Sequence, residues 1–139
     1  MQIVKHDLDR RKRRSKRMYR AIQYQLEHVF DIHNLRNFTL ADTRGLVLAY
    51  AGHVEEAEVL AAYAPMLSTR MNRRSRAHIL DRVRHFVPDA SDVQIRSFDV
   101  GGETLHLTVL GGGNALQHAD LYRAVTGIRR IFEQERSAA

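Results

Sequence analysis

A β-hairpin pattern near the middle of the chain constrains its fold more strongly than any other feature of the sequence. Residues 36–42 alternate, with Phe38 and Leu40 on one side, which predicts a half-buried strand. Asp42-Thr43-Arg44-Gly45 follows as a turn, because Asp favours the first turn position and Gly can adopt a positive φ. Residues 46–51 return as a nearly continuous apolar run, so we predict a strand in the centre of a sheet.

A second hairpin pattern lies nearer the end of the chain. Residues 93–100 and 103–110 read as strands that are joined by Gly101-Gly102, a strong two-residue turn signal. Gly111-Gly112-Gly113 then ends the second strand of the pair. Consecutive hairpins predict an antiparallel sheet.

Four segments have the periodicity of amphipathic helices, and they cover residues 8–33, 54–71, 75–86 and a last stretch that ends near Arg136. We expect Asp7 to cap the first helix, and Asn114 or Asp120 to cap the last. Pro65 predicts a kink in the second helix or a restart there. Gly127 predicts close packing of the last helix against the sheet.

The order of these elements indicates one α+β domain. We expect an antiparallel sheet of four or five strands with helices on both faces, because amphipathic helices must cover a sheet. The chain has 139 residues, which suits a single core. The apolar face of the first helix begins only at Met18, so we divide the chain into a basic arm, residues 1–17, and a domain, residues 18–136.

The positive charge is concentrated in that arm and the helical turn that follows it. The first twenty residues contain nine Lys and Arg against two acidic residues, although the formal net charge of the whole chain is only +6. The remainder is close to neutral, apart from a smaller cluster around Arg70. We predict that these side chains bind a partner: Arg10, Arg11, Lys12, Arg13, Arg14, Lys16, Arg17, Arg20, Arg70, Arg73 and Arg74.

Three kinds of partner would suit a basic arm: nucleic acid, an anionic membrane or an acidic protein surface. A solvated helix end that binds nothing is the alternative. No aromatic residue precedes Tyr19 in the arm, which disfavours stacking on single-stranded bases.

The sequence offers no constellation typical of catalysis, a cofactor or a metal. It has no cysteine, so thiolate chemistry is excluded. The triple glycine lacks the Lys-Ser/Thr ending of a phosphate loop. None of the histidine pairs has the i, i+4 spacing of a helical metal site: His28 and His33, His78 and His85, His106 and His118. We therefore expect a non-enzymatic protein without a cofactor.

The segment from Phe38 to Ala49, with its Asp-x-x-Gly turn and Gly-Leu-Val-Leu-Ala strand, runs into an acidic, alanine-rich helix. This pattern resembles the Roadblock family of dynein light-chain-type domains and their bacterial relatives, and the order of elements is similar from about residue 18 to 134. The resemblance implies a Roadblock/profilin-like sheet with helices on both sides, homodimerisation, and regulation of a Ras-like small GTPase or scaffolding of a motor assembly. Two features depart from it: two strands instead of three after the second helix, and the added helix at 75–86.

A stripe of small side chains on the second helix is either core or half of a symmetric interface. The resemblance favours the interface, so we assign a dimer contact to Ala57, Leu60, Ala61 and Ala64.

The function that these patterns favour is a homodimeric regulator of a small GTPase or another signalling partner. The alternatives are a nucleic-acid-associated module that uses the basic residues, and a sensor like the GAF and PAS domains with a small ligand between sheet and helices. No run of about 20 apolar residues and no signal sequence is visible, so we expect a cytoplasmic protein.

Overall fold

A computed structural model describes residues 2–88, 90, 93–111 and 118–137, and gives side chains for all of these except 2–15, 118–119 and 136–137. Its helices and strands are α1 (Gln2–Ile32), β1 (Asn37–Ala41), β2 (Val47–Gly52), α2 (Val54–Leu67), α3 (Arg73–Arg84), β3 (Gln94–Val100), β4 (Glu103–Leu110) and α4 (His118–Ser137). None of the helices in this described part combines the length and apolar character that a membrane-spanning segment requires.

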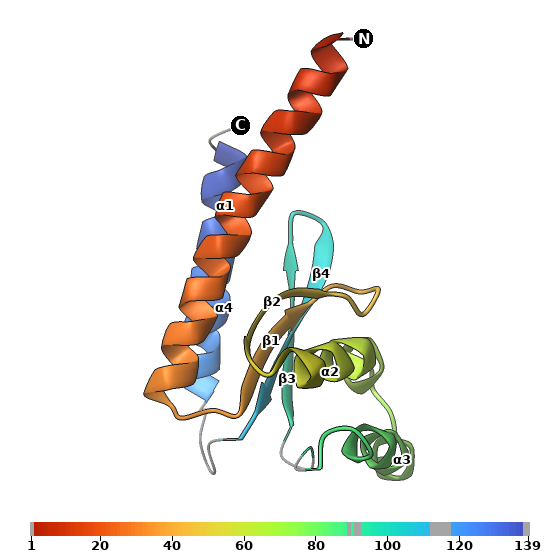
Figure 1. The fold of residues 1–139 in the computed structure, drawn as a ribbon. Coiled ribbons are helices and arrows are strands. Elements are labelled where there is room, and N and C mark those ends of the chain that lie inside the picture. The colour runs from red at the N-terminus through yellow and green to blue at the C-terminus, as the bar shows by residue number, and fades with distance from the viewer. Residues whose placement is uncertain (1, 89, 91–92, 112–117, 138–139) are drawn as a thin grey trace.

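The strands of the described residues form one antiparallel sheet with the order β2-β1-β4-β3. Helices α1 and α4 lie side by side on one face, and α2 covers the other face with α3 beyond it (Figure 1). This architecture confirms the predicted α+β class with helices on both faces of the sheet.

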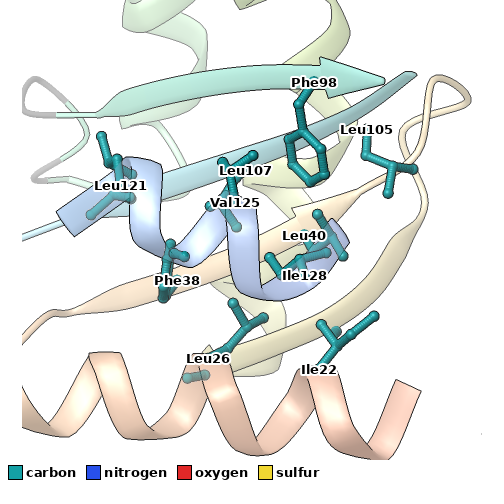
Figure 2. Close-up of a cluster of buried hydrophobic side chains, with 14 of the residues drawn as sticks. Ile22, Leu26, Phe38, Leu40, Phe98, Leu105, Leu107, Leu121, Val125 and Ile128 are labelled. Atoms are coloured by element: carbon teal, nitrogen blue, oxygen red, sulfur yellow. The ribbon is translucent and has the colours of Figure 1, made fainter. Parts of the chain in front are cut away.

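The larger core lies between the sheet and the α1–α4 pair. Ile22 and Leu26 of α1 and Ile128 of α4 are fully buried, and they pack over Phe38 and Leu40 of β1 (Figure 2). A smaller cluster on the opposite face joins α2 and α3 to the sheet through Leu60, Val83, Val87, Ala90, Val93 and Leu110. The apolar stripe that was predicted to begin at Met18 therefore faces the core, and Met18 is itself buried.

The positions of β1 and β2 within the sheet differ from the prediction. β1 is not half-buried but buried on both faces, because it lies in the middle of the sheet, where α1 contacts one of its faces and α2 the other. Its polar side chains are satisfied beneath α2: Asn37 Nδ2 donates to the His53 carbonyl at 3.2 Å, and Thr39 donates to the Asn37 side chain. β2, predicted to be central from its apolar run, is an edge strand.

The β2 edge is covered by a side chain of α1. The amide of Gln23 accepts a hydrogen bond from the Tyr50 backbone N–H at 2.9 Å and donates one to the Tyr50 carbonyl. A neighbouring strand would make the same pair of contacts, so Gln23 takes the place of a strand at this point. Covering an edge in this way protects it from pairing with another chain.

The turn between β1 and β2 has the predicted form. Asp42 is buried and accepts hydrogen bonds from the backbone N–H groups of Arg44 and Leu46, at 2.9 and 3.0 Å. Burial alone would raise the pKa of this carboxyl group, but the hydrogen bonds from Leu46 and Arg44 outweigh it and lower the pKa. Gly45 adopts a φ of 81°, as a turn of this type requires.

Three details of the helices correct the sequence analysis. α1 begins at Gln2, so Asp7 lies within the helix rather than at its cap. α2 runs through Pro65 without restarting and ends at Leu67, before the predicted 71. Gly127 packs closely against α1 instead of the sheet, because a Cβ there would clash with the Gln25 side chain. Asp120 falls in the first turn of α4, and Asn114 lies outside the described residues.

Candidate interaction surfaces

The basic arm forms the first part of α1, which continues without a break through residues 2–32. This end of the helix projects beyond the sheet and past the end of α4 (Figure 1). Lys16, Arg17 and Arg20 are exposed, whereas the side chains of Arg10 to Arg14 lie outside the described residues. The arm is therefore a helical extension of the domain.

The second basic cluster lies at the opposite end of the molecule, where α3 packs beneath α2 (Figure 1). Arg70, Arg73 and Arg74 are exposed. The neighbouring Arg76 is partly buried and donates to the Leu67 carbonyl at 2.9 Å, which fixes α3 to the end of α2. In one copy of the chain the two predicted basic regions therefore lie apart, and binding by either region stays a prediction.

The alanine stripe of α2 lies against the sheet within a single copy. Ala57, Leu60, Ala61 and Ala64 are each 0% exposed. Their small side chains allow α2 to approach closely, and a Cβ placed on Gly45 of the turn would lie only 3.1 Å from the Ala62 Cα. The outward face of α2 presents other residues, among them Glu58 and Met66.

The sheet edge at β3 contrasts with the shielded edge at β2. β3 pairs with β4 along its length, and no further strand of the described chain lies beside it. Its exposed positions are Gln94, Ser97 and Asp99. An open edge is a template for another strand, so β3 is a candidate contact between two chains.

A buried histidine beside this edge was missed by the sequence reasoning. His106 is 4% exposed, and its Nδ1 lies 2.7 Å from the Ser97 Oγ on β3. Burial lowers the pKa of His106, although the nearby Asp42 carboxylate acts in the opposite direction. The sequence analysis considered His106 only as one of a pair with His118, and no pattern in the sequence indicated that its face of β4 is buried beneath α2.

We expect His106 to make the fold less stable in mild acid. Its folded-state pKa lies below the ordinary value, so the unfolded chain binds the proton more strongly, and stability falls as pH drops from about 6.5 through the folded-state pKa. Urea denaturation at pH 8 and pH 5 of the native chain and of His106→Asn measures this. The native chain should lose more stability than the variant, and equal losses would contradict the assignment.

A surface hollow of about 380 Å³ lies between α1 and the β2 edge. Glu27 and Asp31 line it with Phe30 and Tyr50. The two apolar clusters fill the spaces between the sheet and the helices. A GAF- or PAS-like sensor was expected to hold its ligand in such a space, so this arrangement disfavours that alternative. Among the described residues, no three His, Asp or Glu side chains gather as a metal site.

Apart from α3 and the number of strands after it, the order of elements, the antiparallel sheet and the placement of α1 and α4 opposite α2 are those of a Roadblock-type fold. The two departures noted in the sequence are also present, since α3 follows α2 and two described strands follow α3. No protein-family model and no curated protein sequence matches the chain.

Solved structures of MglB have the same fold. Myxococcus xanthus MglB superposes with a TM-score of 0.52 at 12% identity, over 84% of this chain and 91% of that chain. The gliding protein MglB of Thermus thermophilus gives 0.53 at 17% identity, over 84% and 92%. An MglB structure with a tetrameric arrangement gives 0.50 at 18% identity, over 85% and 92%. At these identities the likeness establishes the fold.

Proposed function

We propose that this chain is a homodimeric Roadblock-type regulator or scaffold that acts on a Ras-like small GTPase in the cytoplasm. The observation that carries the proposal is the fold, which matches the MglB structures over more than four fifths of the chain. The resemblance of residues Phe38 to Ala49 to the Roadblock family supports the proposal separately, because it rests on the amino-acid sequence and not on the superposition. The domain acts by binding in this proposal, and the GTPase supplies the nucleotide chemistry.

The contact between two copies, in this proposal, is the open edge of β3. The two edges differ, since Gln23 bonds to the edge of β2, while no strand of the described chain pairs with the outer edge of β3. Two β3 strands related by a two-fold axis would extend the sheet across both copies. The buried alanine stripe supports each protomer from within, and the contact does not depend on it.

Sedimentation velocity with a charged β3 edge tests the dimer. Gln94→Lys with Asp99→Lys places two lysines on the edge, where like charges oppose pairing, and should convert a dimer into a monomer. Glu133→Lys with Gln134→Lys makes the same change in charge on the exposed side of α4 and should leave the mass unchanged. A native chain that is monomeric at tens of micromolar would remove this part of the proposal.

Affinity capture from the native cell tests the partner. The tagged full chain, captured in the presence of magnesium with a GTP analogue or with GDP, should retain a GTP-binding protein in one nucleotide state and release it in the other. Recovery of nucleic acid alone, in both conditions, would favour the alternative of a nucleic-acid-associated module.

A further inference from the structure

The solvent-facing side of α1 has a regular pattern of charge that the proposed function does not use. Arg17, Arg20, Tyr24, Glu27 and Asp31 recur every three or four residues, so they share one face of the helix. All five are exposed, and Tyr24 is 64% exposed. This face is opposite to the one that packs on the sheet.

The two signs of charge are separated along this face, with the cations on one side of Tyr24 and the acids on the other. Lys16 and Arg20, like Glu27 and Asp31, stand four residues apart, and such like-charged pairs destabilise an isolated helix. No ion pair within the described part of the chain joins these side chains. A helix selected for solvation alone would mix the two signs.

The pattern is also nearly symmetric about Tyr24. Arg17 and Asp31 each lie seven residues from it, about 10 Å along the helix axis. Arg20 lies four residues before Tyr24 and Glu27 three residues after it. When a second identical helix is turned end to end, its cations therefore meet these acids, and its acids meet these cations.

The hollow beside α1 gives the incoming cations a place to bind. Glu27 and Asp31 form its acidic rim, while Phe30 and Tyr50 add aromatic surface within a volume of about 380 Å³. An arginine side chain can bind such a site, since its guanidinium pairs with carboxylates and stacks on aromatic rings.

We propose that two copies of this chain associate through antiparallel pairing of α1, with Tyr24 at the two-fold axis. Arg17 and Arg20 of each copy then face Glu27 and Asp31 of the other. The contact is isologous and distinct from the β3 edge, so it does not rest on the proposed function. Because it depends on exposed ion pairs, the association is weak and weakens further as salt is added.

Charge reversal tests the pairing in the full chain. Arg17→Glu with Arg20→Glu leaves the face wholly acidic, and Glu27→Arg with Asp31→Arg leaves it wholly basic. Each variant alone should self-associate about tenfold more weakly or worse by sedimentation equilibrium. A 1:1 mixture of the two, and the chain that carries all four changes, should recover the association. Any contribution of β3 is common to all variants, so their differences report on α1.

Cross-linking tests the position of the two-fold axis. The native chain has no cysteine, so Tyr24→Cys introduces a single thiol. Mild oxidation should yield a disulfide-linked dimer, whereas Met66→Cys, an exposed position on α2, should remain monomeric on reducing-agent-free gels. Equal cross-linking of the two variants, or charge-reversed chains that associate as well as the native one, would overturn the proposal.

Discussion

Replacing Phe38 by alanine should lower the free energy of unfolding by about 3–5 kcal/mol, the range for removing a buried aromatic side chain from a core. Phe38 is fully buried on the central strand β1, beneath Leu26 of α1 (Figure 2). Both helices of this face rest on the same cluster, so the void left by the ring cannot be filled by moving one of them. Urea or thermal denaturation followed by circular dichroism measures the loss.

Phe86 provides the matched control for this substitution. It is also a phenylalanine, but it is 65% exposed after α3. Phe86→Ala should change stability by no more than about 0.5 kcal/mol, as surface substitutions usually do. Similar losses for the two variants would contradict the position of the core between α1, α4 and the sheet.

Gly52→Ala should lower the free energy of unfolding by about 3 kcal/mol or more, since two costs combine at this residue. Gly52 has a φ of 111°, which an L side chain adopts only with strain. A Cβ there would also lie 2.6 Å from the Arg36 carbonyl oxygen, which belongs to backbone and cannot turn aside. Arg36 holds α2 in place through two hydrogen bonds to the Glu56 carboxylate, at 2.8 and 3.2 Å.

Gly102 separates these two costs. Its φ of 81° is also positive, but nothing lies within 4 Å of the position that a Cβ would occupy. Gly102→Ala should therefore cost only about 1–2 kcal/mol, which is the conformational strain alone. If the two variants lost the same stability in denaturation experiments, the close approach of β2 to Arg36 would be wrong.

Local patterns predicted the elements well because they depend on neighbours in the sequence. The strand Glu103–Leu110 begins and ends where alternation and the Gly101-Gly102 turn placed it. The order of strands depends instead on contacts between distant segments. An apolar run at 46–51 suited a central strand. However, β4, which comes much later in the chain, pairs with β1 from Asn37↔Leu110 to Ala41↔His106 and leaves β2 at the edge.

The sequence predicted the candidate surfaces only where they carry clusters of charged residues. The exposure of Arg17, Arg20, Arg70 and Arg74 agrees with the sequence analysis, because arginine is rarely buried without a partner. The environment of His106 and the shielding of β2 by Gln23 could not be predicted, because both arise from packing across the sheet. Periodicity identified the stripe of α2, and only the structure shows that a single copy buries it.

The fold separates the covered faces of the sheet from the surfaces that a partner of the proposed regulator could reach. α1 and α4 close one face of the sheet, α2 closes the other, and no strand of the described chain pairs with the outer edge of β3. The added helix α3, which carries exposed arginines, lies at the other end of the molecule from the basic arm (Figure 1). A partner held at one end of the molecule would therefore leave the other end accessible.

The most direct test of the account is the binding of the purified chain to the captured GTPase, measured by isothermal titration calorimetry with the GTPase loaded with a GTP analogue or with GDP. We predict saturable binding whose affinity differs at least about tenfold between the two nucleotide states, a coupling of about 1.4 kcal/mol. Equal affinity in both states, or no binding in either, would contradict regulation of a small GTPase by this chain.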